Sequence, residues 1–210
     1  MYKTLAIENW NRKEHFHFFK TFEEPFFGVT LEVDSDTAWH YCQKRQLSFF
    51  LYCLYQALQA ANQVEPFRYR ISGDNVYIYD MVHASPTIDR DNGTFGFAYM
   101  NYYPSFDEFA FEAQQEIQRV KQSTGLEPAI NSENVIHFSA LPWISFKSLS
   151  HARCFRFADS CPKISFGKVF DERGKKFLPV SIHVHHALMD GYHVAQWVDR
   201  FQEGLQSTHH

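Results

Sequence analysis

The segment from residue 177 to residue 188, FLPVSIHVHHAL, constrains the fold more than any other part of this sequence. Apolar side chains occupy every second position, and His186 extends that row by one step. Because successive side chains of a β-strand point to opposite faces, this pattern predicts a strand with one apolar face. His183 and His185 then point the other way. The apolar row comprises Leu178, Val180, Ile182 and Val184.

Strand-like and helical patterns alternate irregularly along the rest of the chain. Strands are predicted at residues 26–34, 93–103, 134–146, 161–171 and 176–188, and a hairpin around Gly-Asp-Asn at residues 68–80. Helices are predicted at residues 9–22, 36–46, 48–64, 105–125 and 191–206, with Asp36 and Ser105 as N-caps and Gly125 after the fourth. This order predicts the α/β fold class, as a two-layer sandwich with a mixed β-sheet.

Composition supports one globular domain over residues 1–210. The chain is 45% hydrophobic and 21% charged, which permits a sizeable core, and no repeat or linker divides it. The net charge is −4, and no Lys/Arg run exceeds the short GKK at residues 174–176. These features argue against a nucleic-acid surface.

The compartment is expected to be the cytoplasm. No apolar stretch is long enough for a membrane span, and the first ten residues do not read as a signal peptide. The cysteines have no CxxC spacing, so free thiols are expected at Cys42, Cys53, Cys154 and Cys161.

The histidine-rich segment admits three interpretations from its residues alone. His186 lies at the end of a buried row, where partial desolvation keeps an imidazole neutral and able to accept a proton. His183 and His185 form an HxH pair on one strand face, a spacing that some zinc sites use, with His193 nearby. No CxxC or HExxH motif supplies further ligands. The third interpretation is that these histidines simply pack.

Four segments together resemble one family. HHALMDG (residues 185–191) resembles the HHxxxDG signature of the chloramphenicol acetyltransferases, and NWNRKEHF (residues 9–16) resembles their W-x-R-K-E-H-F element. SALPWISF (residues 139–146) and PFRYRISGDNVYIYDMVHASPT (residues 66–87) resemble two further segments in the same order. The resemblance covers roughly the whole chain. It implies the CoA-dependent acyltransferase fold, which that family shares with dihydrolipoamide acyltransferase catalytic domains.

The resemblance also implies a chemistry. His186 falls on the family's general base, which removes the proton of the acceptor hydroxyl as that oxygen attacks the thioester of acetyl-CoA. Ser139 falls on the serine that stabilises the oxyanion. Asp190 and Arg12 match a buried ion pair that orients the site. The family forms trimers with active sites between subunits, so we expect a homotrimer and a small hydroxylated acceptor.

Further positions carry binding roles by the same resemblance. Trp143 and Lys168 fall near the CoA moiety, and Phe18 and Phe19 line the acceptor site. Ser165 falls where the family has a threonine that holds an ordered water. No metal is expected, and His183 and His185 are expected to be non-catalytic.

Two acceptor-facing segments depart from the family pattern. Residues 20–30 carry Glu23 and Glu24 where the family is mostly neutral, and residues 148–162 carry His151, Arg153 and Arg156. The leading hypothesis is an acetyltransferase acting on chloramphenicol or a similar acceptor. The alternatives are a non-catalytic or differently specific trimeric relative that binds CoA or another ligand, and a metal site at His183 and His185.

Overall fold

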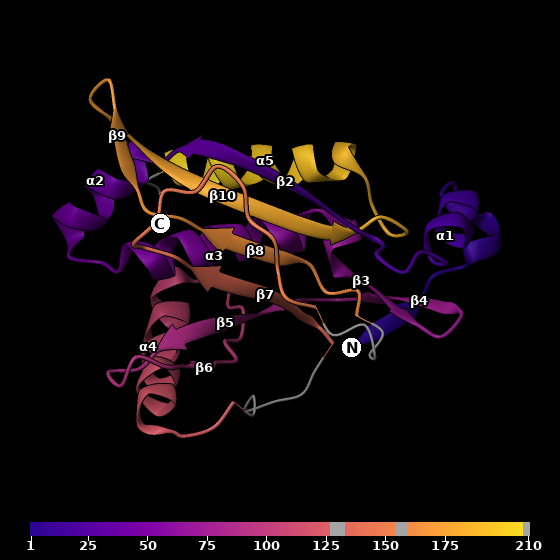
Figure 1. The fold of residues 1–210 in the computed structure, drawn as a ribbon, viewed down its shortest axis with the longest axis horizontal. Coiled ribbons are helices and arrows are strands. Elements are labelled where there is room, and N and C mark those ends of the chain that lie inside the picture. The colour runs from indigo at the N-terminus through magenta and orange to yellow at the C-terminus, as the bar shows by residue number, and fades with distance from the viewer. Residues whose placement is uncertain (127–132, 154–158, 208–210) are drawn as a thin grey trace.

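The computed structural model describes residues 1–126, 133–153 and 159–207. A seven-stranded mixed sheet has the order β2-β10-β8-β7-β5-β6, with β9 paired to β10 (Figure 1). The β5–β7 and β7–β8 pairs are parallel and the other pairs antiparallel. The strands are β2 (Phe26–Asp34), β5 (His83–Asp89), β6 (Phe95–Phe97), β7 (Val135–Ala140), β8 (Lys163–Phe166), β9 (Phe170–Glu172) and β10 (Lys175–His185).

Helices form the second layer, which confirms the predicted α/β architecture with a mixed sheet. The longer helices lie along one side of the sheet, and α1 lies apart, beyond the start of β2 (Figure 1). The helices are α1 (Lys13–Phe19), α2 (Asp36–Arg45), α3 (Phe49–Gln63), α4 (Phe106–Gln122) and α5 (Gly191–Gln206), with short 3-10 turns η1 (Ile7–Asn9) and η2 (Glu65–Arg68).

The core lies between the sheet and these helices. The predicted apolar row of β10 is buried in it, together with alternate residues of β8 and β7. Trp197 of α5 is fully buried, stacks on Phe201, and donates its indole N–H to the carbonyl of Ala57 on α3 at 3.1 Å. The opposite face of the sheet is therefore the one that carries the odd-numbered side chains of β10.

A smaller antiparallel sheet has the order β1-β4-β3, from β1 (Tyr2–Thr4), β3 (Tyr69–Ser72) and β4 (Asn75–Tyr79). The predicted hairpin is present as β3–β4, and its two-residue turn begins at Gly73, whose φ of 58° suits glycine.

Other predictions needed correction. Residues 93–103 form only β6 and an isolated bridge between Ala84 and Met100, because this segment lies at the sheet edge. The N-cap of α2 is Ser35, with Asp36 in the first turn, and α4 ends at Gln122 rather than at Gly125. The strands β1 and β5 were not predicted.

Free thiols are present at those cysteines that the structure describes. Cys42, Cys53 and Cys161 are buried free thiols, and Cys154 lies outside the described residues. Within the described ranges, the structure has no helix with the length and apolar character that a bilayer crossing requires.

Arg70 joins the small sheet to the strand that carries Ser139. Its side chain is 1% exposed, and its guanidinium donates to the carbonyl oxygens of Glu133 and Val135 at 2.6 Å each, at the start of β7. It also donates to the carbonyls of Phe67 and Tyr69 at 2.9 and 2.5 Å. One side chain thus donates to four backbone carbonyls.

Replacing this side chain should be costly. We expect Arg70→Met to lower the free energy of unfolding by about 3 kcal/mol, because buried carbonyls left without donors lose their hydrogen bonds without regaining water. Denaturant unfolding measures the change. Arg200→Met is the matched control, since Arg200 pairs with Glu203 in solvent and its loss should cost about 0.5 kcal/mol or less. Equal effects of the two substitutions would contradict this account of Arg70.

Candidate active site

His186 lies one residue beyond the end of β10, in the turn that leads into α5. Its backbone N–H donates to the carbonyl of Pro25 at 2.8 Å, which continues the pairing of β10 with β2. Its half-buried ring stacks on Phe19 of α1, with centroids 3.9 Å apart, and contacts Phe27 at 4.6 Å. Two aromatic side chains therefore fix the plane of this imidazole.

A backbone hydrogen bond fixes which nitrogen of His186 carries the proton. Nδ1 lies 3.2 Å from the carbonyl oxygen of Met189. A carbonyl can only accept, so Nδ1 carries the hydrogen and Nε2 of the neutral ring carries the lone pair. The arrangement presents Nε2 as the proton-accepting atom.

An ion pair between Arg12 and Asp190 holds the turn in place. The guanidinium of Arg12 donates to the carboxylate of Asp190 and, through Nη2, to the carbonyl of His186 at 3.1 Å. Asp190 also caps α5 by accepting from the N–H of Tyr192 at 3.0 Å, and it contacts His193 at 3.0 Å. Partial burial raises the pKa of Asp190, but Arg12 and these other groups outweigh it and hold that pKa below 3.8.

The other histidines of the segment occupy the opposite side, as the alternation predicted. His185 is buried against Phe26, and desolvation followed by the charge of Arg153 lowers its pKa to about 4. His183 pairs in register with Gly28 and with Lys163. Their surroundings differ from those of His186 because the strand places them on another face.

Ser139 and Ser165 form a second group of candidate residues, at the centre of the sheet. Their Oγ atoms are 2.5 Å apart, and Ser165 is fully buried. They are paired in register on neighbouring strands, and Ser165 is in turn paired with Ser181 of β10. All three project from the face that the helices leave uncovered. The predicted site residues Ser139 and Ser165 are therefore brought together.

The structure does not bring Ser139 and His186 together within one chain. Ser139 lies level with Ser181, and His186 follows Ser181 by five residues along β10. At about 3.3 Å per residue, the two positions are separated by about 16 Å along the strand direction alone. Phe18 and Phe19 belong with His186: they contact one another, and Phe18 is 60% exposed.

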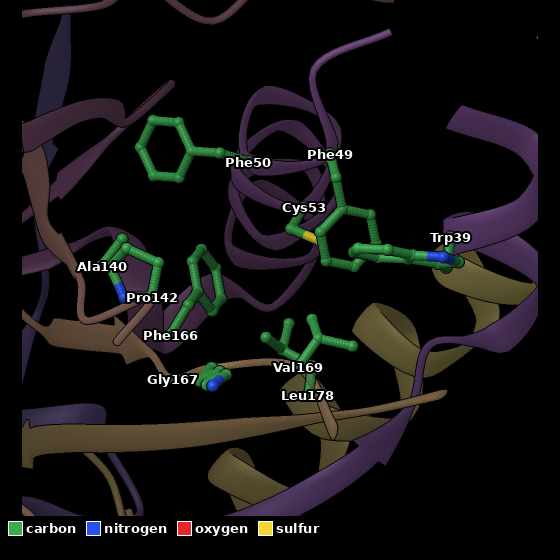
Figure 2. Close-up of a pocket in the computed structure, with 11 residues that line it drawn as sticks. Trp39, Phe49, Phe50, Cys53, Ala140, Pro142, Phe166, Gly167, Val169 and Leu178 are labelled. Carbon is green, nitrogen blue, oxygen red and sulfur yellow. The ribbon is translucent and has the colours of Figure 1, made fainter. Parts of the chain in front are cut away.

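A cavity of about 330 Å³ opens where β7 and β8 end, next to Ser139. Figure 2 shows Trp39, Phe49 and Phe50 of the helices on one side, with Ala140 and Phe166 of the strands facing them. Lys168 lies at its border, and its backbone N–H donates to Ile144 at 2.8 Å. Trp143 follows the lining residue Pro142 and is 68% exposed. The aromatic lining from α2 and α3 was not anticipated, although the predicted helices at residues 36–46 and 48–64 carry it.

Side chains that could bind a metal ion lie close together away from His186. In the described parts of the chain, ligand atoms of His137, Asp159 and Cys161 lie within 4.8 Å of one another, and His183 and His185 are not in that group. The ammonium of Lys163 donates to Asp159 at 2.5 Å and to the carbonyl of Cys161 at 3.1 Å. Because the positively charged ammonium of Lys163 already contacts these oxygen atoms, it disfavours the binding of a metal ion at the same place.

Comparisons with known proteins agree on one family. The family model described as chloramphenicol acetyltransferase matches residues 1–202. Chloramphenicol acetyltransferase 3 of Escherichia coli is 31% identical over 205 residues, covering 96% of each chain. The chloramphenicol acetyltransferase of Bacillus pumilus is 30% identical over 201 residues, covering 95% of this chain and 91% of its own.

Solved structures give the same result for the fold. A chloramphenicol acetyltransferase superposes with a TM-score of 0.91 at 31% identity, over 98% of this chain and 100% of its own. A probable dihydrolipoamide acetyltransferase from Listeria monocytogenes superposes with a TM-score of 0.68 at 11% identity, over 92% of this chain and 88% of its own. The second likeness concerns the fold alone.

The Arg12–Asp190 pair should make a pH-dependent contribution to stability. Asp190→Asn keeps a side chain that can cap α5 but removes the negative charge, so we expect a lower Tm at neutral pH. A carboxyl group with a lowered native pKa stabilises above its unfolded pKa and ceases to do so as pH falls through the native value. The Tm difference should be complete above about pH 4 and vanish in more acidic solution.

Thermal unfolding followed by circular dichroism measures this difference across the pH range. Asp199→Asn is the control, because Asp199 is exposed on the same helix and its neutralisation should leave Tm nearly unchanged. A Tm difference for Asp190→Asn that stayed constant into strong acid would assign the effect to something other than charge.

Proposed function

The chain belongs to the chloramphenicol acetyltransferase family, and from this premise we propose that it transfers the acetyl group of acetyl-CoA to a hydroxyl of chloramphenicol or of a similar small acceptor. The observation that carries the proposal is the hydrogen bond that orients the ring of His186. Its Nδ1 is committed to the carbonyl of Met189, so Nε2 is the atom that can accept a proton.

In the proposed reaction, His186 acts as general base. Nε2 takes the proton of the acceptor hydroxyl while that oxygen attacks the thioester carbonyl of acetyl-CoA. The carbon–sulfur bond then breaks, and the imidazolium returns its proton to the departing thiolate, which leaves as free CoA. Stacking on Phe19 holds the ring so that this base keeps one orientation.

Ser139 is the proposed donor to the oxyanion. Its hydroxyl hydrogen can point to the developing negative charge when the neighbouring Ser165 Oγ, 2.5 Å away, donates to Ser139 rather than accepting from it. Removing one such donor typically lowers turnover by about 10²–10³. In the family Ser165 corresponds to a threonine with a water-holding role; here the direct Ser139–Ser165 contact supports an orienting role.

The cavity at the strand ends is the proposed binding site for acetyl-CoA. Its apolar lining suits the pantetheine arm, and Lys168 at the border supplies a positive charge for phosphate. Trp143, exposed beside the cavity, offers a surface for stacking. Ala140 lines the cavity and directly follows Ser139 at the end of β7, but the Ser139 side chain points to the other face of the sheet, so the arm has to pass the strand end to bring its thioester to that hydroxyl.

The separation of His186 from Ser139 supports an active site shared between copies of the chain. About 16 Å along the strand is too far for one chain to place base and oxyanion donor on the same reacting carbon. We therefore propose a homotrimer in which one copy supplies His186, with Phe18 and Phe19, and its neighbour supplies Ser139 and the acetyl-CoA cavity. The exposed ring of Phe18 suits burial in such an interface.

His186→Ala should abolish nearly all turnover. We expect the rate of thiol release from acetyl-CoA to fall by about 10²–10⁴, because the acceptor hydroxyl loses its base. Calorimetry should find acetyl-CoA binding retained, since the cavity does not include His186. His40→Ala is the control: His40 lies on α2 with its side chain 68% exposed, and its loss should leave the rate unchanged.

Two other outcomes would have clear meanings. Full activity of His186→Ala would remove His186 as the base. Binding of acetyl-CoA by the wild-type protein, with transfer to no hydroxylated acceptor, would favour the non-catalytic ligand-binding relative.

Mixing two inactive variants tests the shared site. His186→Ala and Ser139→Ala subunits, refolded together, should recover activity, because some sites then combine the intact serine of one with the intact histidine of the other. In a ring with random mixing, about a quarter of the sites are intact. Each variant refolded alone is the control, and no recovery on mixing would place the whole site within one chain.

A further inference from the structure

The cavity at the ends of β7 and β8 has two ends of different character. Figure 2 shows Ala140 and Pro142 at one end, where β7 finishes, and Trp39 of α2 at the other. Phe49 of α3 lies beside Trp39. The proposed acetyl-CoA site thus has an inner end next to Ser139 and an outer end at Trp39.

Trp39 and Phe49 form a T-shaped pair at the outer end. Their ring centroids are 5.0 Å apart, and their planes are inclined by 68°. Both rings are half-buried, and both line the cavity. A T-shaped pair leaves a corner in which a third planar ring can stack on one partner and meet the other edge-on.

The fold does not use Trp39 in its core. Among the described residues, Phe49 packs against the core and Trp39 does not. Helix α2 is anchored instead by the buried side chains of Ala38 and Cys42. An indole that borders a cavity lacks contact atoms on that side, and a bound molecule can supply them. Trp39 is therefore available to a ligand at little cost to the packing of the helix.

The register of the sheet gives the distance between the two ends of the cavity. Ser139 lies level with Ser181 of β10, across β8. Leu178, which lines the cavity, is three residues from Ser181. Lys176, whose ammonium lies 5.9 Å from the ring centroid of Trp39, is five residues from it. At about 3.3 Å per residue, the outer end lies roughly 10–16 Å from the level of Ser139 along the strand.

The pantetheine arm of CoA has a similar length. Between its sulfur and the pyrophosphate, the arm has about as many chain bonds as four residues, and four residues span roughly 14 Å when extended. An arm that brings its thioester to Ser139 therefore places the start of the nucleotide part at the level of Trp39.

The charges around the outer end suit a molecule that carries phosphate. Lys168 lies exposed at the border of the cavity. Lys176 contacts Asp171 at 3.3 Å, and because Asp171 is 53% exposed, water screens this pair and a phosphate can replace it. Within the described part of the chain, no Asp or Glu side chain lines the cavity. A phosphate group at this end therefore meets attraction without opposing repulsion from the lining.

We propose that the adenine base of acetyl-CoA packs in the corner between Trp39 and Phe49, and that Lys176 contacts a phosphate beside it. This inference rests on the proposed function, in which acetyl-CoA is the donor. Trp39 then determines specificity for the nucleotide part of the donor. It takes no part in the transfer itself, because the reacting thioester lies at the other end of the arm.

Donors with and without the nucleotide test the proposal. S-acetylpantetheine carries the same thioester and arm as acetyl-CoA but has no adenine. We expect Trp39→Leu to lower kcat/KM for acetyl-CoA about tenfold or more and to leave that for S-acetylpantetheine unchanged, because only acetyl-CoA loses a stacked base. Thiol release in the presence of chloramphenicol or another accepted alcohol measures both values. Trp39→Phe keeps an aromatic ring and should restore most of the loss.

Two further variants make the comparison specific. His40→Leu is the control, because His40 is the next residue on α2, its side chain is 68% exposed, and both donors should react as in the wild type. Equal losses for the two donors in Trp39→Leu would contradict the proposal, since a general defect affects both. A loss confined to acetyl-CoA in Trp143→Leu, with none in Trp39→Leu, would place the base on Trp143 and overturn the proposal.

Calorimetry separates a failure of this inference from a failure of the proposed function. The Kd of acetyl-CoA should rise about tenfold or more in Trp39→Leu, and this measurement needs no turnover. An unchanged Kd in a variant that still transfers acetyl groups would overturn only the adenine site. A raised Kd in a protein that acetylates no acceptor would support the adenine site and overturn the proposed transfer. If the wild-type protein did not bind acetyl-CoA, both would be overturned.

Discussion

The strict alternation of side chains along β7, β8 and β10 is the constraint on which the rest of this structure depends. It sends Ile136, Ile164 and Ile182 into the core beneath the helices and leaves hydroxyls and imidazoles on the other face. A shift of one residue in any pairing would exchange the two sets, burying ionisable groups against the helices. Register therefore determines both the core and the chemistry of the opposite face of the sheet.

A second arrangement places the proposed base where the alternation ends. Beyond His185 the chain is no longer a strand, and the ring of His186 is held by Phe19, by the carbonyl of Met189 and by the turn that Arg12 ties to Asp190. These contacts come from α1, β10 and α5, which are far apart in sequence. The proposed base and the proposed oxyanion donor thus belong to two separately supported parts of the chain, and this division is the reason for proposing a site shared between copies.

The sequence predicted those parts of the structure that local patterns determine. Strand β2 and helix α5 have the predicted bounds, and the β3–β4 turn lies at the predicted glycine, because alternation, periodicity and turn chemistry are local. The opposite placement of His186 and His183 followed from alternation as well. The family resemblance supplied the roles of His186, Ser139, Asp190 and Arg12, and those roles stay predictions.

The remainder depended on long-range pairing that no local pattern contains. Strand β5 contains a proline, and β1 exists only because β4 pairs with it. The cavity needs α2 and α3 to meet the ends of β7 and β8, and the contact of His151 with His183 needs a loop to cross the sheet. In each of these features, the residues become neighbours only in the folded chain, so a local sequence pattern does not predict the contact.

The sheet face that carries Ser139 finds hydrogen-bond partners within the chain. Ser139 pairs with Ser165, the hydroxyl of Ser181 lies 3.3 Å from Nδ1 of His183, and the ammonium of Lys163 pairs with Asp159. A buried or half-buried layer of hydroxyls and imidazoles is stable because such partners are in place. In the proposed trimer, a neighbouring copy that brings His186 to Ser139 therefore adds a base to a layer that is already ordered, and the Ser139 hydroxyl needs little reorganisation to stabilise the oxyanion.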